Sequence, residues 1–157
     1  KSLNKLITCF LNNLKSFLGS NCSMSKKYHE FSCRVYYEDT DLAGLVYYAN
    51  YLKFIERARS EWLRELGIDQ NQFKINEGKV FVVRKIEAEY LVAAKYDNVL
   101  LIRTRLMNCG PVRLIINQDI YFKGKVIFQA IVTIVCIGPK GKVLRFPADI
   151  RRLMINY

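Results

Sequence analysis

Residues 36–66 read YYEDTDLAGLVYYANYLKFIERARSEWLREL, and this stretch decides the fold because it joins a polar turn to one long amphipathic segment. Apolar side chains recur at steps of three and four from residue 51 onward, which predicts a helix over 50–66. Its apolar stripe consists of Tyr51, Ile55, Ala58, Trp62 and Leu66, widened by Leu52 and Leu63. Gly67 follows directly, and glycine commonly ends helices. A helix with such a stripe must bury it against another layer of structure.

The segments on both sides of this helix are typical of β-strands. Alternating apolar residues and β-branched runs predict one strand before the helix and four or five after it. The expected strands are 31–37, 80–90, 98–107, 112–122, 126–137 and 143–146. Gly124 and residues 138–141 mark tight turns, and Pro147 is suited to open a short C-terminal helix. We therefore expect an α+β fold, with an antiparallel β-sheet wrapped around one long central α-helix.

The chain has 157 residues, of which 51% are hydrophobic, so it is long enough for one domain with a substantial core. We expect that single domain over 24–157. Residues 1–23 differ, because apolar side chains at helical spacing lie opposite lysines and asparagines and no acidic residue occurs. This pattern predicts a basic amphipathic extension that can lie on a membrane surface but is too short and polar to span one. The alternative is an upstream segment without function.

The charge and the reactive side chains narrow the classes of partner and site. A formal net charge of +11 favours anionic partners, among them nucleic acid, membrane surfaces, acidic carrier proteins and phosphorylated cofactors. No nucleic-acid-binding motif is present, so we expect no nucleic-acid partner. The five cysteines form no CxxC pair, which indicates a reducing compartment, and suitably spaced metal ligands are missing. His29 is the only histidine, so any histidine-based triad would depend on it.

The polar turn before the helix carries the candidate chemistry. A helix N-terminus offers unpaired backbone N–H groups and the positive end of a dipole, which can stabilise a developing oxyanion. Asp41 lies just upstream, where a carboxylate can activate water or attack a carbonyl. Gly44 permits a close approach or an unusual backbone angle in the turn. From the residues alone, Asp41 can equally be a helix-capping or Asx-turn aspartate.

The 36–66 stretch closely resembles the signature of the 4-hydroxybenzoyl-CoA thioesterase-like family, and in particular the Tol–Pal-associated YbgC group of acyl-CoA thioesterases. The resemblance rests on D-x-D-x-x-G followed by an aromatic pair and N-Y, and continues more loosely to about residue 150. It implies a hotdog fold assembled as homodimers or homotetramers, with active sites at the subunit interface. It also implies hydrolysis of acyl-CoA, or of acyl groups on acyl-carrier protein, with Asp41 as the catalytic aspartate and Asp39 as a turn residue.

The resemblance also suggests roles for three further residues. Many members of the YbgC group have histidine where this chain has Tyr48, so Tyr48 acts there through its backbone N–H, through its hydroxyl, or as an aromatic wall of the pocket. The family places basic residues near the CoA phosphates, and Arg113 and Arg145 occupy the corresponding stretches. Together with Gly44 they are the expected substrate-binding residues. No metal is implied, and no cofactor, because CoA is part of the substrate.

Three other functions stay open from the sequence. A non-catalytic hotdog scaffold that binds acyl-carrier or cell-envelope proteins would fit the loss of histidine at Tyr48. A hotdog dehydratase is disfavoured because His29 is badly placed to pair with a carboxylate, and nucleic-acid binding would rest on charge alone. For the thioesterase, we expect a cytoplasmic enzyme with peripheral contact to the inner membrane through residues 1–23.

Overall fold

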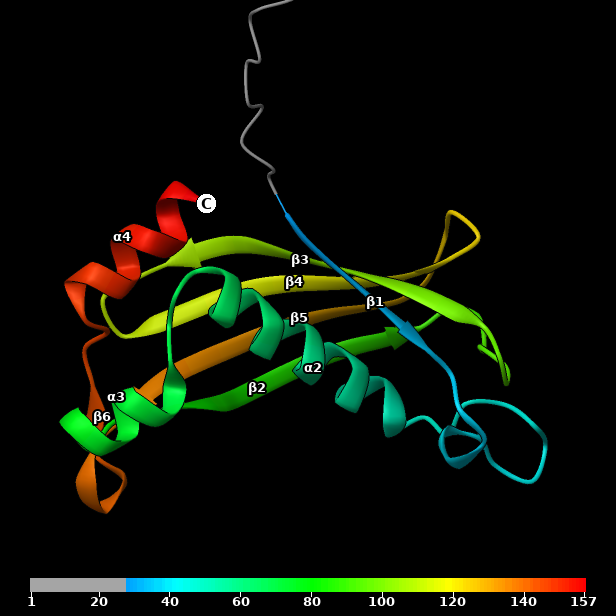
Figure 1. Ribbon diagram of the computed structural model, residues 1–157, viewed down its shortest axis with the longest axis horizontal. Coiled ribbons are helices and arrows are strands. Elements are labelled where there is room, and N and C mark those ends of the chain that lie inside the picture. Colours follow the sequence, from blue (N-terminus) through cyan, green and yellow to red (C-terminus); the bar gives the residue numbers. More distant parts are fainter. Residues whose placement is uncertain (1–27) are drawn as a thin grey trace, which may run out of the picture.

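Figure 1 shows the computed structural model, which describes residues 28–157. The expected extension, residues 1–23, lies outside the described residues, as does the beginning of the expected domain up to residue 27. The described elements are, in chain order, β1 (His29–Arg34), the 3-10 turn η1 (Tyr37–Asp39), α2 (Asn50–Glu65), α3 (Gln70–Glu77), β2 (Val80–Tyr90), β3 (Val99–Cys109), β4 (Arg113–Phe122), β5 (Lys125–Ile137), η2 (Pro139–Gly141), β6 (Val143–Leu144) and α4 (Ala148–Asn156).

The strands form one antiparallel sheet in the order β1-β3-β4-β5-β2, with β6 pairing with the end of β5. In this part of the chain, β1 and β2 are therefore the edge strands. All pairings are antiparallel, and β-bulges interrupt the register at three of them, which increases the twist of the sheet. Helix α2 crosses one face of this curved sheet, so the expected sheet wrapped around one long helix is confirmed (Figure 1).

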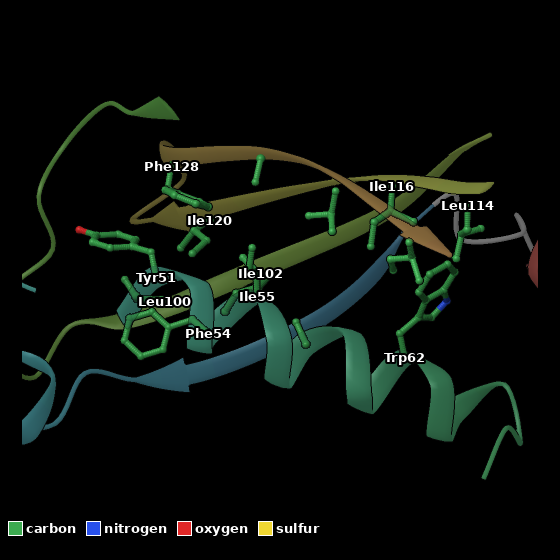
Figure 2. Close-up of a cluster of buried hydrophobic side chains, with 14 of the residues drawn as sticks. Tyr51, Phe54, Ile55, Trp62, Leu100, Ile102, Leu114, Ile116, Ile120 and Phe128 are labelled. Atoms are coloured by element: carbon green, nitrogen blue, oxygen red, sulfur yellow. The ribbon is translucent and has the colours of Figure 1, made fainter. Parts of the chain in front are cut away.

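The core lies between α2 and the facing side of the sheet (Figure 2). Tyr51, Ile55, Ala58 and Trp62 of α2 are at most 3% exposed, which confirms these members of the predicted apolar stripe. Phe54, which that stripe left out, is fully buried as well. The sheet side chains they meet are Leu100, Ile102, Leu114, Ile116, Ile120 and Phe128, all buried. Each such side chain contributes about 1.5–3 kcal/mol relative to exposure. This burial fixes the position of α2 on the sheet.

Helix α2 ends where the sequence predicts. Gly67 has a φ of +74°, in the left-handed region, and its N–H donates to the carbonyl of Arg64 at 2.9 Å. Ile68 then donates to the carbonyl of Leu63 at 2.9 Å, and its side chain is buried. The chain thus reverses at the end of α2 and leads into α3, which the sequence pattern did not predict.

One polar network interrupts the apolar core. Gln118 is fully buried, and its Nε2 donates to the carbonyl of Ile55 and to Oγ1 of Thr104, both at 2.9 Å. Its Oε1 accepts a 2.8 Å bond from the Arg59 guanidinium. Burial lowers the pKa of the Arg59 guanidinium, and the nearby Glu56 carboxylate acts in the opposite direction. The amide therefore ties α2 to the centre of the sheet through two hydrogen bonds, and the third joins it to Thr104 on the neighbouring strand β3.

Among the described residues, no helix is both long and apolar enough to cross a membrane. Helix α4 begins after Pro147, as expected, and it packs near the end of β3 (Figure 1).

Replacing Gln118 with methionine should lower the free energy of unfolding by about 2–4 kcal/mol, because the volume is kept while buried partners lose their hydrogen bonds. Urea denaturation measures the change. Gln129→Met is the matched control, since Gln129 is exposed and makes one 3.3 Å bond to Asp119. Equal effects of the two substitutions would contradict a structural role for the buried network.

Candidate active site

The loop that leads into α2 is a short hairpin-like turn. Thr40 pairs with Val46 in an isolated β-bridge, the N–H of Asp41 donates to the carbonyl of Leu45 at 2.8 Å, and Gly44 donates back to the carbonyl of Asp41 at 2.9 Å. Gly44 has a φ of +72°, and an added Cβ would meet no atom within 4 Å. Of the two reasons expected for glycine here, the structure therefore supports the backbone angle and not a close approach.

The two oxygens of the Asp41 carboxylate have different environments. Oδ1 accepts backbone N–H groups from Ala43 at 2.9 Å and from Leu45 at 3.3 Å, an Asx-turn arrangement. Oδ2 accepts no hydrogen bond from any residue between 28 and 157. The side chain is exposed and lies on the wall of a pocket. One oxygen thus holds the carboxylate in place, and the other is available to a ligand or to water.

Asp39 has the opposite environment, and it is structural. It is 3% exposed, and its Oδ2 accepts the N–H of Tyr36 at 2.9 Å. Its backbone carbonyl accepts two bonds, from the N–H of Tyr47 at 2.9 Å and from the buried Asn50 side chain at 3.0 Å. Asp39 therefore connects the turn after β1 to the first residue of α2, in agreement with its expected role as a turn residue.

Backbone donors are left free at the entrance to α2. Asn50 donates to the carbonyl of Tyr47 at 2.8 Å, and the N-cap residue Ala49 provides no side-chain cap. Within the described part of the chain, the N–H groups of Tyr48 and Ala49 donate to no acceptor. They lie at the positive end of the helix dipole, so they suit an anionic oxygen.

A tyrosine-rich pocket of about 430 Å³ unites these features. Its walls are Asp41, Leu45, Val46, Tyr47, Tyr48, Tyr51, Tyr90, Leu91, Val92 and Ala93. The second wall comes from the end of β2 and the segment after it, which is attached to the loop through the bond from Val46 N–H to the carbonyl of Ala94, at 2.9 Å. The Tyr51 hydroxyl accepts the N–H of Ala94 at 2.8 Å, which holds the same segment against α2.

Three phenols of this pocket, those of Tyr47, Tyr51 and Tyr90, have raised pKa values. The side-chain hydrogen bond with Tyr48 raises the pKa of Tyr47, and burial raises the pKa of Tyr51 and Tyr90 above the ordinary value near 10. Neutral phenols can donate and accept hydrogen bonds, but they are poor bases. Asp41 is therefore the side chain of the pocket that can act as a base.

A second cavity, of about 640 Å³, lies at the other end of α2 and has different chemistry. It also combines an aspartate with a helix start, because Asp69 precedes α3. However, Oδ1 of Asp69 already accepts the N–H groups of Asn71 at 2.8 Å and Gln72 at 3.0 Å. The helix donors and the carboxylate satisfy each other there, so this cavity lacks the free donors of the Asp41 pocket.

The expected site residues do not all meet within one copy of the chain. Asp41, Gly44 and Tyr48 lie at one end of the sheet. Arg113 begins β4 at the opposite end, and Arg145 lies there too, because the adjacent Phe146 donates to the carbonyl of Pro111 at 2.9 Å (Figure 1). Strand β4 alone spans ten residues, about 30 Å. The side chains of the two arginines therefore do not reach the Asp41 pocket of the same copy.

Sequence reasoning missed Tyr90 and the segment that follows it. The alternation of 86–90 places Tyr90 on the same side of β2 as Ile86 and Ala88, and the register confirms that side. Its proximity to Tyr48, however, depends on how the far edge of the sheet curves beneath α2, which no local pattern encodes. No group of three or more potential metal-ligating side chains occurs in residues 28–157.

Comparison with known families gives a consistent result. A family model described as the Thioesterase-like superfamily matches residues 35–153. Acyl-CoA thioesterase YbgC of Haemophilus influenzae is 36% identical over 122 residues, which cover 77% of this chain and 90% of that protein. Acyl-CoA thioester hydrolase YbgC of Escherichia coli is 40% identical over 119 residues, 74% of this chain and 88% of that protein.

Solved structures agree with these relatives. A probable thioesterase from Bartonella henselae matches with a TM-score of 0.73 and 38% identity, over 76% of this chain and 99% of that one. A 4-hydroxybenzoyl CoA thioesterase mutant complexed with 4-hydroxybenzoyl CoA matches with a TM-score of 0.77, over 82% of this chain and 99% of that one. At 21% identity, the second likeness shows the fold alone.

The two aspartates of the turn should differ in their effect on stability. Asp39→Ala should lower the free energy of unfolding by about 1–3 kcal/mol, because a sheltered N–H loses its acceptor. Asp41→Ala should cost less, since the N–H groups it releases are exposed to water. Chemical denaturation of both variants gives the comparison, and a larger loss for Asp41→Ala would show that the structural roles are reversed.

Proposed function

The chain belongs to the Thioesterase-like superfamily and has its hotdog fold, and from this premise we propose that it hydrolyses acyl-CoA to a free acid and CoA. One observation carries the proposal at the level of the site: Asp41, which has one unoccupied carboxylate oxygen, and Tyr48, whose backbone N–H is unpaired at the start of α2, line the same pocket. A thioester needs both, because its carbonyl must be polarised while a nucleophile approaches.

The proposed mechanism assigns polarisation to the backbone. When the thioester carbonyl enters the pocket, its oxygen accepts from the N–H groups of Tyr48 and Ala49, and negative charge that develops on it lies at the positive end of α2. Asp41 then either removes a proton from the attacking water or attacks the carbonyl carbon itself, forming an anhydride that water hydrolyses. Both routes break the bond between carbonyl carbon and sulfur, and the thiolate of CoA leaves and takes up a proton.

The Asx-turn geometry of Asp41 supports a catalytic role and does not compete with it. Holding Oδ1 with two N–H groups restricts the rotation of the carboxylate, so Oδ2 keeps one direction toward the pocket. Such preorganisation reduces the entropy that positioning would otherwise cost in the transition state. The capping and catalytic interpretations of the sequence therefore apply to different oxygens of one side chain.

We assign the other residues of this end to supporting roles. Gly44 shapes the turn that presents Asp41, and because it is not among the residues that line the pocket, we assign it no direct contact with the substrate. The Tyr48 ring lies 4.7 Å from that of Tyr47, measured between centroids, and forms an aromatic wall. Its backbone N–H acts on the carbonyl, so the histidine of many YbgC relatives is replaced here without loss of the oxyanion donor.

We further propose that the working enzyme is a homodimer in which each active site uses residues from both copies. Edge strand β2 has eleven residues and no second neighbour in the described part of the chain. Antiparallel pairing of β2 with β2 of a second copy would exchange the two ends of the sheet. The Arg113 and Arg145 end of one copy would then lie toward the Asp41 pocket of the other, where guanidinium groups can bind the phosphates of CoA.

The thiol carrier, the cofactor requirement and the cellular compartment follow from acyl-CoA as the substrate. The thiol carrier is CoA, with acyl-carrier protein as the second candidate, and no cofactor is needed for the steps assigned to Asp41 and the backbone. We place the enzyme in the cytoplasm, where CoA thioesters are metabolised. Contact with the inner membrane would fall to residues 1–23, which the structure does not describe.

Asp41→Asn should lower kcat/KM for acyl-CoA hydrolysis by about 10²–10⁴-fold, the range expected when a positioned base or nucleophile is lost. A panel of acyl-CoA chain lengths, followed by release of free thiol, measures this. Asp97→Asn is the matched control, because Asp97 is a loop aspartate that pairs with Arg34 outside the pocket. A folded Asp41→Asn enzyme with wild-type turnover would refute the assignment, and an inactive wild type would favour the non-catalytic scaffold.

The shared site can be tested by mixing two impaired variants at a substrate concentration well below the wild-type KM. Asp41→Asn and the double variant Arg113→Ala, Arg145→Ala should each be impaired, the second mainly in KM. If each site combines the two copies, random re-assembly of an equal mixture should restore about a quarter of wild-type sites, because half of the dimers are mixed and each carries one intact site. Activity of the mixture that equals the average of its components would place the whole site in one copy.

A further inference from the structure

We propose that Tyr90 is a positioning residue for the reaction: its hydroxyl holds the carbonyl of Tyr48 and thereby orients the backbone N–H groups that receive the oxyanion. The inference rests on the proposed thioester hydrolysis and goes beyond it, because it assigns a role to a residue of the far edge strand. Tyr90 is the last residue of β2 and lies 42 positions from Tyr48 in the sequence.

The contact geometry places Tyr90 under the entrance to α2. Its hydroxyl donates to the carbonyl oxygen of Tyr48 at 3.2 Å. Its ring packs edge-on against Tyr51 at 5.5 Å and against Phe128 at 5.1 Å, both measured between ring centroids. Since Tyr51 and Phe128 belong to the buried core, they fix the ring of Tyr90 and with it the direction of the hydroxyl.

The peptide group transmits this restraint to the proposed donors. The carbonyl of Tyr48 and the N–H of Ala49 belong to one planar peptide, so fixing the carbonyl fixes the N–H that points the other way. A hydrogen bond accepted by a carbonyl also polarises the same peptide and strengthens its N–H as a donor. Holding the carbonyl additionally restricts rotation within Tyr48, whose own N–H is the second donor.

The entrance to α2 has no side-chain cap, so the orientation of the Tyr48–Ala49 peptide depends on other contacts. Ala49 supplies no side-chain cap, and the donors of Tyr48 and Ala49 have no acceptor among residues 28–157. The carbonyl of Tyr48 is therefore the group through which the protein can hold this peptide while leaving its N–H open. Burial raises the pKa of Tyr90, so the phenol keeps the proton that it donates.

The first test compares Tyr90→Phe with the wild-type full chain on an acyl-CoA that the wild type hydrolyses. The ring and its packing are kept, so the thermal unfolding temperature should stay nearly constant. We expect kcat to fall by about tenfold with KM changed less than about twofold, because the lost interaction acts on the transition state. Tyr96→Phe is the control, since Tyr96 is exposed in the following loop and does not line the pocket.

The second test measures polarisation directly. A ¹³C-carbonyl acyl-CoA bound to Asp41→Asn should show its carbonyl stretch at lower frequency than in water, and adding Tyr90→Phe should move it back up. A purely structural role would leave this frequency unchanged.

Three results would overturn the inference. They are an unchanged kcat in Tyr90→Phe, a loss confined to KM, or an unshifted carbonyl frequency, each with an active wild type. A wild type inactive on every acyl-CoA would instead overturn the proposed function, and this inference with it.

Discussion

The burial of one face of α2 against the inner side of the sheet is the constraint on which the rest of the structure depends. Trp62 and Phe54 are almost completely inaccessible, and replacing such a side chain by alanine typically costs about 3–5 kcal/mol. Because the stripe continues to Tyr51 in the first turn, the start of the helix is held as firmly as its middle. Gln118 adds direction to this packing, since two of its hydrogen bonds, to the Ile55 carbonyl and from the Arg59 guanidinium, depend on the position of α2.

Because packing holds the start of α2 in place, this helix does not need a side-chain cap at its N-terminus. Most helices satisfy their first N–H groups with a side chain at the N-cap, as Asp69 does for α3. At α2 the corresponding residue is Ala49, and the connections run instead through the buried Asn50 and the carbonyl of Asp39. The loop is thus fixed without occupying the donors that a substrate oxygen would use. Unsatisfied polar groups at a functional site are stabilised by packing elsewhere in the fold.

The separation of charges along the sheet is the reason for our proposal that each active site uses two copies of the chain. The Asp41 end is lined by tyrosines, whereas Arg113 and Arg145, the proposed phosphate ligands, lie at the other end. Antiparallel pairing of β2 with β2 of a second copy would bring the two ends together, because the two-fold axis of such a dimer places the arginine end of one copy beside the Asp41 end of the other. The same edge would otherwise expose unpaired backbone groups, which proteins usually cover. The separation of the charged groups and the unpaired edge of β2 therefore both favour a dimer paired through β2.

The sequence by itself determined most of the elements and predicted the turn that we propose to be reactive. The three-to-four spacing of 51–66, the glycine that ends it and the alternation of 86–90 are local signals, and the structure has α2, the left-handed Gly67 and β2 at these places because steric and burial preferences act within a few residues. Helix α3 escaped prediction because it is short, polar and capped by Asp69. Tertiary structure alone decided that Gln118 lies in the core, that Tyr90 reaches Tyr48, and that the arginines lie far from Asp41. These placements depend on how strands that are distant in the sequence pair and how the sheet curves. Many weak contacts determine both, and they produce no periodic pattern in the sequence.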